Sequence, residues 1–265
     1  MDNSVKVNDN NIQDKKGITG STLKLIAIIT MLIDHIAATV LERMMSVLSS
    51  NTANHWLSNF NLNAEQLHKI YFIMRAIGRI AFPIFCFLLV EGFIHTRNVW
   101  KYALRLAIFA LVSEIPFNLA LFAEPFNFSH QNVFFTLLIG LLVLIGMKYS
   151  SEKFMANKVA DLLVGIVILV AGCVIAELLN TDYSAMGILT ITIMYVLRKS
   201  HIASMLGGCV VLALLSFYEI FAVFALIPAS FYNSKRGLKL KYIFYIFYPA
   251  HLFILYLICN FMRLL

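Results

Sequence analysis

The sequence predicts an all-α polytopic membrane protein, a bundle of about nine transmembrane helices with its N-terminus in the cytoplasm. Of the 265 residues, 60% are hydrophobic and 13% are charged, whereas soluble domains average roughly half and a quarter. Apolar runs recur at about 17–25 residues, the length that a helix needs to cross the hydrocarbon core. The alternation typical of a membrane β-barrel does not occur. We therefore expect a multi-pass protein of the cytoplasmic membrane, surrounded by the lipid bilayer.

Nine apolar runs define the predicted bundle, and residues 21–265 form one transmembrane domain. Residues 1–20 are rich in Asn, Asp and Lys and have no apolar periodicity, so we expect a polar cytoplasmic tail there. The boundary near Tyr218 and Glu219 is the hardest to place, because the last spans follow one another closely. The expected spans are 23–48, 71–94, 102–122, 131–148, 159–179, 184–197, 202–217, 219–232 and 242–262.

The formal charge of +7 follows the predicted topology. Cytoplasmic loops of membrane proteins carry an excess of Lys and Arg, and one set of loops holds most of these residues here. The charge therefore indicates orientation, with no nucleic-acid partner expected. The basic residues on that side are Lys6, Lys15, Lys16, Lys24, Arg97, Lys101, Arg105, Lys148, Lys153, Lys158, Arg198, Lys199, Lys235, Arg236, Lys239 and Lys241.

The four cysteines predict neither a disulfide framework nor a metal site. Cys86, Cys173, Cys209 and Cys259 all fall inside predicted spans, where a free thiol behaves as a small apolar group. Their spacing does not match a metal-ligand motif. No metal is expected.

Ionisable residues at membrane depth are costly, and each is a candidate for function. Spans four to eight are nearly free of them, apart from Asp161 and Glu177 near span ends. His35 lies about twelve residues into the first span counted from its cytoplasmic end at Leu23, or about 18 Å, which is near the midplane. We therefore expect a site built from the first three spans and closed by the last. Its candidates are Asp34, His35, Arg75, Arg79, Glu91, Arg105, Glu114 and His251.

Several of these residues also have a purely structural interpretation. Arg75 and Arg79, spaced i, i+4, can neutralise Asp34 or Glu114 in an ion pair that holds the bundle together. For the Asp34–His35 pair this interpretation is weaker, because a helix–helix tether would use Ser, Thr or Asn at lower cost.

The cytoplasmic basic residues and the last histidine have structural interpretations as well. Topology alone is a sufficient reason for Arg97, Lys101 and Arg105. His251, close to Pro249, can be a hydrogen-bonded histidine of the core.

Six blocks of sequence together resemble the TraX family, in order from about Leu23 to Leu255. The resemblance implies kinship with acyltransferase-3 proteins and heparan-α-glucosaminide N-acetyltransferase, which carry an essential His on a first helix that begins with a basic residue. His35, with Lys24 before it, occupies that position. The blocks are LKLIAIITMLIDHIA, RAIGRIAFPIFCFLLVEGFIHTRN, YALRLAIFALVSEIPFNLA, QNVFFTLLIGLL, DYSAMGIL and KYIFYIFYPAHLFIL.

The resemblance implies an acetyl-CoA-dependent N-acetyltransferase, since the family is named for a protein that acetylates the N-terminal amine of a conjugative pilin. The acetyl donor would come from the cytoplasm. The acceptor, a peptide N-terminus or a small-molecule amine, would be reached from the other face. CoA is strongly anionic, and basic side chains bind phosphates well. The residues expected to bind it at the cytoplasmic mouth are Lys24, Glu91, His95, Arg97 and Arg105.

His35 can act in either of two ways. A neutral imidazole can take a proton from the acceptor amine as a general base, or attack the thioester itself as a nucleophile. A carboxylate is expected to orient the ring: Asp34, or Glu114 or Glu91 from a neighbouring helix. The residues expected to meet the acceptor are Arg75, Arg79, Asn118, Asn132 and His251.

Two other functions fit the same residues. A proton-coupled transporter could use Asp34, His35, Glu114 and His251 as a relay. A membrane scaffold without catalysis would tolerate apolar replacements of Asp34 and His35.

Overall fold

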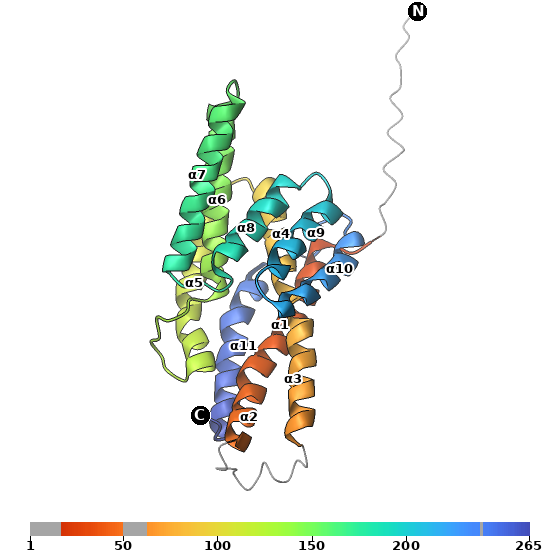
Figure 1. The fold of residues 1–265 in the computed structure, drawn as a ribbon, viewed down its shortest axis with the longest axis vertical. Helices are drawn as coiled ribbons and strands as arrows, with labels where there is room; N and C mark the ends of the chain where they lie inside the picture. The colour runs from red at the N-terminus through yellow and green to blue at the C-terminus, as the bar shows by residue number, and fades with distance from the viewer. Residues whose placement is uncertain (1–16, 50–62, 239–240) are drawn as a thin grey trace, which may run out of the picture.

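The protein is an all-helical bundle in the part of the chain that the structure describes (Figure 1). This computed structural model describes residues 17–49, 63–238 and 241–265. The predicted polar tail lies outside the described residues up to position 16. Ile18, which follows, pairs with the loop after α10: its N–H donates to the Phe231 carbonyl at 2.9 Å, and its own carbonyl accepts from the Asn233 N–H at 3.0 Å.

The nine predicted runs all form helices, but they differ in length. In the described ranges, six helical segments are long and apolar enough to cross a membrane, and three apolar helices are shorter. The short ones correspond to the sixth, seventh and eighth predicted spans. The six long segments are Gly20–Ser49, Ala64–His95, Val99–Phe122, Val133–Lys153, Lys158–Leu178 and Tyr242–Phe261.

Two of the long segments are interrupted. The first consists of α1 (Gly20–Ile36), a π-helical turn η1 (Ala37–Leu41) and α2 (Glu42–Ser49). The second breaks at Arg79 and Ile80, between α3 and α4. The remaining elements are α3 (Ala64–Gly78), α4 (Ala81–His95), α5 (Val99–Phe122), α6 (Val133–Lys153), α7 (Lys158–Leu178), α8 (Ser184–Val196), α9 (His201–Ala213), the 3₁₀-helix η3 (Phe217–Ala225), α10 (Leu226–Ser230) and α11 (Lys241–Phe261).

Polar caps explain where several helices begin. The Thr19 side chain accepts from the Thr22 N–H at the start of α1, and Asn63 forms a capping box with Gln66 at the start of α3. Asn98 caps α5 in the same way. Each cap satisfies a backbone N–H that has no partner within its own helix.

The main apolar core is formed by buried side chains of α1, α4, α5, α6, α8, α9 and α11, with a few from η3 and α10. Leu23, Ile84, Leu141 and Leu252 are fully buried there. α7 packs against α6 and α8 and otherwise exposes apolar side chains along its length. Because a lipid-facing helix has no reason to hide apolar groups, this exposed face is consistent with contact to the bilayer.

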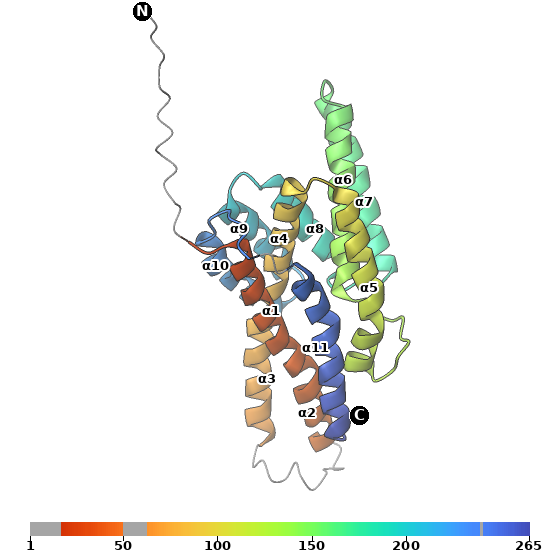
Figure 2. The same cartoon turned by 180° about the vertical axis from the view of Figure 1, so that it is seen from behind.

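The helix ends that carry the basic residues lie together. The turns between α4 and α5, between α6 and α7 and between α8 and α9 lie at the upper end of the view, and the hairpin of α6 and α7 extends furthest there (Figures 1 and 2). The start of α1 lies below these turns, and α1 runs downwards from it. The orientation expected from the positive-inside rule puts this end in the cytoplasm.

This orientation can be tested with single cysteines at exposed positions of opposite ends. In right-side-out membrane vesicles, we expect Ser129→Cys, in the loop after α5, to react with a membrane-impermeant maleimide. Ala156→Cys, in the turn between α6 and α7, should react only after permeabilisation. The native thiols Cys86, Cys209 and Cys259 are buried, whereas Cys173 is partly exposed, so both variants are made in a Cys173→Ser background. The reverse labelling pattern would invert the topology.

Candidate functional site

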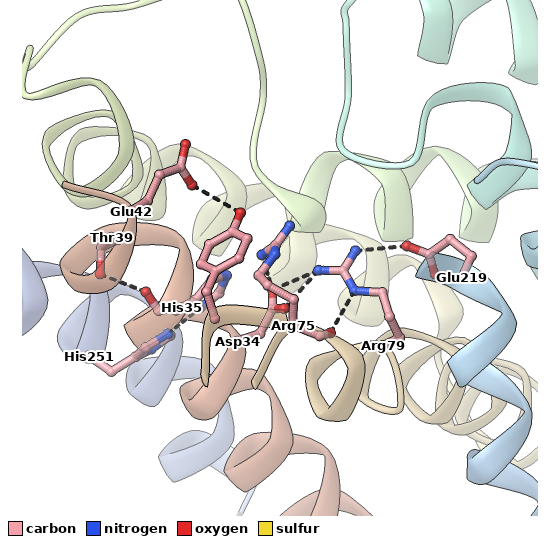
Figure 3. Close-up of polar contacts among 9 residues, drawn as sticks. Asp34, His35, Thr39, Glu42, Arg75, Arg79, Glu219 and His251 are labelled. Carbon is pink, nitrogen blue, oxygen red and sulfur yellow. Dashed lines mark hydrogen bonds and ion pairs between the residues drawn. The ribbon is translucent and has the colours of Figure 1, made fainter. Parts of the chain in front are cut away.

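A buried carboxylate lies between two arginines in the middle of the bundle (Figure 3). Arg75 Nη1 is 2.7 Å from Asp34 Oδ2, and Arg79 Nη2 is 2.8 Å from Asp34 Oδ1. The i, i+4 spacing puts both guanidinium groups on the same side of α3. The sequence left open whether Asp34 or Glu114 neutralises these arginines, and the structure assigns both of them to Asp34.

Arg79 also binds a second carboxylate, Glu219 of η3, with 2.7 Å between Nη1 and Oε1. The Arg79 and Glu219 side chains are only 12% and 3% exposed. A buried ion costs several kcal/mol unless it is paired, and this network balances two carboxylates with two guanidinium groups. It thereby ties α1, α3 and η3 together. Sequence reasoning did not select Glu219, whose only signal is an acidic residue within an apolar stretch.

Gly78 allows the close approach of α3 to Asp34. A Cβ atom at this position would collide with the Asp34 carboxylate and its Cβ. Glycine normally weakens a helix by roughly 0.5–1 kcal/mol relative to alanine. Here that loss is offset, because the missing side chain lets the ion-pair network form.

His35 points to a different neighbour from Asp34. Adjacent helical residues are about 100° apart, so Asp34 faces α3 whereas His35 faces α11. His35 Nδ1 lies 2.7 Å from His251 Nε2, and His251 Nδ1 lies 2.8 Å from the Phe247 carbonyl oxygen (Figure 3). Among the described residues, no carboxylate bonds to the His35 ring. The expectation that Asp34, Glu114 or Glu91 orients the ring is therefore wrong for this structure.

The π-helical turn η1 begins two residues after His35. π-Turns within α-helices are rare and frequently occur at functional sites. The Thr39 hydroxyl donates to the His35 carbonyl at 2.6 Å, which gives that carbonyl a partner where the regular helical ladder is disturbed. Nothing in the sequence singled out this turn.

His35 lines a cavity of about 500 Å³, which we call the His35 cavity. It is open on one side, and aromatic side chains from several elements form much of its wall. Phe82 and Tyr183 stack there with ring centroids 3.6 Å apart. Beyond Asp34 and the arginines, its polar lining residues are Glu42, His130, Gln131 and Asp182.

Asp182 is held in the wall of this cavity by its backbone. Its N–H donates to the Gln131 carbonyl at 2.9 Å, and its carbonyl accepts from the Thr136 hydroxyl. Its carboxylate, exposed towards the cavity, has no hydrogen-bond or ion-pair partner among the described residues. The pKa of Asp182 is raised to about 6 in total. Enclosure by protein is the largest cause; the nearby Arg79 acts in the opposite direction, and the carboxylates of Asp34 and Glu219 act in the same direction as enclosure.

A second cavity, of about 690 Å³, opens nearer the basic helix ends, and we call it the basic cavity. All five residues predicted to bind the acetyl donor line it, as does Arg236 from the loop before α11. Tyr102 and Tyr245 add aromatic surface. The five predicted residues are Lys24, Glu91, His95, Arg97 and Arg105.

The two cavities share part of their walls. Met31, Phe85, Val133 and Tyr248 line both of them. Tyr248 also meets the His35 ring edge-on, with centroids 5.9 Å apart. Only a thin layer of side chains therefore separates the histidine from the basic cavity.

Glu114, Asn118 and Asn132 belong to neither cavity. Asn132 Nδ2 donates to Glu114 Oε2 at 2.5 Å and to the Ala110 carbonyl at 2.8 Å. Asn118 and Asn132 are both buried. The structure therefore uses this cluster to join α5 to the start of α6, and it does not bring Glu114 to His35 or the asparagines to the His35 cavity, as the sequence led us to expect.

The comparison with known proteins identifies the family. Residues 19–259 match the family described as TraX protein. The chain belongs to the TraX family. It is also 29% identical, over 260 residues, to the probable fimbrial assembly protein FimC, serogroup H1, of Dichelobacter nodosus, which covers 88% of this chain and 92% of that protein. No solved structure matches this TraX-family chain.

The relay expected of a transporter is not continuous in this TraX-family protein. Of its four residues, His35 and His251 are in contact. Asp34 is bound by two arginines, and Glu114 is bound by Asn132. The geometry therefore supports a site centred on the histidine pair rather than a chain of proton carriers.

Removing Arg79 should be strongly destabilising, because it leaves Asp34 without one partner and Glu219 without the one ion pair that it makes among the described residues. We expect Arg79→Met to lower the free energy of unfolding by about 3–5 kcal/mol, measured by denaturant unfolding in detergent. Lys69→Met is the matched control, because the Lys69–Glu65 pair is about 70% exposed and such pairs contribute about 1 kcal/mol or less. Equal effects of the two variants would contradict the structural role of the network.

Proposed function

We propose that this protein is an integral-membrane acetyltransferase of the cytoplasmic membrane, with its N-terminus inside. It transfers an acetyl group from acetyl-CoA in the basic cavity to an amine in the His35 cavity. The observation that carries this proposal is the shared wall between the two cavities, with a histidine on one side and a basic cluster on the other. The position of Lys24 and His35 on the first helix supports kinship with the acyltransferase-3 enzymes.

The basic cavity fits an anionic nucleotide. Lys24, Arg97, Arg105 and Arg236 come from three separate parts of the chain and line the same space. Arg105 Nε is buried without a hydrogen-bond partner in the described part of the chain, and guanidinium groups bind phosphates in well-defined geometry. When bound, acetyl-CoA supplies an acetyl group as a thioester, which amines attack readily.

Glu91 is the acidic residue of the basic cavity, and its carboxylate already has a hydrogen-bond donor. The Glu91 carboxylate accepts a hydrogen bond from the Tyr232 hydroxyl at 3.1 Å. Arg105 in addition lies over the Tyr102 ring, 5.6 Å from its centroid. Both contacts preorganise side chains around the space before a ligand arrives.

His35 supplies the chemistry at the shared wall. As a general base, its imidazole takes the proton that the amine loses as it bonds to the acetyl carbon. As a nucleophile, it first carries the acetyl group on a ring nitrogen. In both cases the carbon–sulfur bond of the thioester breaks, and the amine proton ends on the released thiolate.

The charge balance of the His35 cavity supports an amine as the acceptor. Arg75 and Arg79 are balanced by Asp34 and Glu219. Asp182 and Glu42 then leave the cavity lining with excess negative charge. A primary amine enters as an ammonium group, whose three N–H donors pair well with carboxylates. It releases one proton to water before its nitrogen attacks the acetyl carbon.

A peptide N-terminus is the amine that the comparisons favour. The relative from Dichelobacter nodosus is named for fimbrial assembly, and a fimbrial subunit presents an N-terminal amine. The aromatic wall around Phe82, Phe117 and Tyr183 suits the apolar side chains that follow such an amine.

Replacing His35 should abolish acetyl transfer without unfolding the protein. We expect His35→Gln to lower transfer from isotope-labelled acetyl-CoA to a model peptide with a free N-terminal amine to background, as measured by mass spectrometry. His68→Gln, at an exposed position of α3, is the matched control and should retain activity. Transfer at the wild-type rate by a folded His35→Gln protein would refute the proposed function.

Asp182 should control recognition of the amine. Because its carboxylate is charged above its pKa of about 6, attraction to the ammonium group should be present above pH 6 and lost below it. The KM for the peptide should therefore rise as the pH falls from 7 to 5, and it is measured separately from kcat. Asp182→Asn should raise the KM about tenfold or more at pH 7, from about 1.5–3 kcal/mol for a hydrogen bond to a charged group, and remove this pH dependence.

The control for Asp182→Asn is Glu124→Gln, which makes the same chemical change in the exposed loop after α5. Its KM should match that of the wild type. A KM unaffected by Asp182→Asn would show that the amine is not recognised at this carboxylate.

A further inference from the structure

The rings of His35 and His251 meet edge to edge. Their planes are 20° from parallel and their centroids are 4.9 Å apart, yet the facing nitrogens are only 2.7 Å apart. Rings stacked face to face would not bring one nitrogen of each so much closer than the ring centres. This near-coplanar contact is the geometry of an N–H···N hydrogen bond, in which one nitrogen donates and the other accepts.

The neighbours of His251 decide which nitrogen donates. His251 Nδ1 faces the Phe247 carbonyl at 2.8 Å. A carbonyl oxygen can only accept, so Nδ1 must carry a proton. In a neutral imidazole the other nitrogen is then an acceptor. His251 Nε2 is therefore the acceptor in the contact with His35, and His35 Nδ1 is the donor.

Both rings are neutral in this arrangement. Among the described residues, neither ring is bonded to a carboxylate, and His251 is 4% exposed. An added proton would create a buried cation without a counterion, close to the guanidinium groups that Asp34 already balances. Such a charge is expensive at this depth.

The remaining nitrogen of His35, Nε2, is the one that does not face His251. With Nδ1 protonated, Nε2 has a free lone pair, and the His35 ring lines the His35 cavity whereas His251 does not. Phe247 stacks against the His251 ring, with centroids 4.8 Å apart, and Tyr248 packs edge-on against both rings. These aromatic contacts restrict the orientation of both histidine rings.

We propose that His251 is a positioning residue that fixes His35 in the Nδ1–H tautomer, so that Nε2 is the nitrogen that reacts. The proposal rests on the proposed function of His35, and it adds the identity of the reacting atom and the residue that selects it. His251 does the work that a carboxylate does in the Ser-His-Asp triad, holding the tautomer and the orientation of the ring. As a neutral acceptor it does so without placing a second negative charge beside the ring.

The test measures the tautomer directly. Protein labelled with ¹⁵N at histidine is placed in lipid nanodiscs without acetyl-CoA or acceptor, and the His35 signals are assigned by their loss in His35→Gln. We expect Nδ1 of His35 to carry the proton in the wild type. His251→Gln, which keeps an oxygen acceptor, should preserve this tautomer, and His251→Met, which removes the acceptor at similar size, should lose it.

Kinetics then separate positioning from folding. We expect His251→Met to lower kcat about 10–100-fold, by analogy with the loss seen when the partner that orients a metal-binding histidine is removed. Its KM for acetyl-CoA should not change, because the basic cavity is untouched. His251→Gln should recover most of the activity. The same replacement at an exposed histidine that lines neither cavity, His68→Met, should leave kcat unchanged.

A wild-type spectrum in which Nε2 of His35 carries most of the proton would overturn the proposal, as would an unchanged tautomer in His251→Met. The spectrum needs no substrate, so it can support the tautomer even if acetyl transfer is not observed. Absence of transfer by the wild type would count against the proposed function alone.

Discussion

The Asp34 carboxylate between Arg75 and Arg79 is the interaction on which the rest of the site depends. A carboxylate at this depth must be paired, and the pairing draws α3 against α1 so closely that only glycine fits at position 78. Arg79 extends the same network to Glu219 on η3. Once Asp34 is fixed, the next residue is fixed too, because it must point about 100° away around the helix. Asp34 and His35 therefore contact two different helices, α3 and α11.

The short helices explain why polar groups gather beside this network. α8 begins at Ser184, near mid-height in the bundle (Figure 1), rather than at the end of the molecule. The residues just before it, Asp182 and Tyr183, therefore reach the depth of Asp34 and line the same cavity. The break between α3 and α4 similarly places Arg79 where the two halves of that segment meet. Full-length helices at these points would have filled the space with apolar side chains.

The sequence predicted the helical elements well, because apolar runs alone reveal helices in lipid. It also predicted that Lys24, Arg97 and Arg105 lie close together, and these three residues line one cavity. It could not choose between Asp34 and Glu114 as the partner of the arginines. Spacing within a helix determines a face, but not which neighbouring helix that face meets.

Other parts of the site could not be predicted from the sequence. Glu219 and Asp182 lie at the edges of apolar runs, where hydropathy places an acidic residue near the membrane surface. In the structure, the helices next to Glu219 and Asp182 are short, so protein surrounds both residues. The π-turn after His35 depends on the packing of several helices, and the pairing of His35 with His251 joins residues 216 positions apart. No local sequence pattern predicts the π-turn or the contact between the two histidines.

The hydrogen-bond partner of His251 Nδ1 helps to choose between catalysis and transport. A proton relay needs a next carrier, yet His251 Nδ1 donates to a backbone carbonyl of its own helix, which does not take up a proton at any ordinary pH. The pair is therefore closed at one end and open only at the His35 cavity. A closed pair of this kind cannot conduct, but it can hold one lone pair in a constant position. That property suits a ring that meets a substrate on a single side, and it favours an enzyme over a transporter.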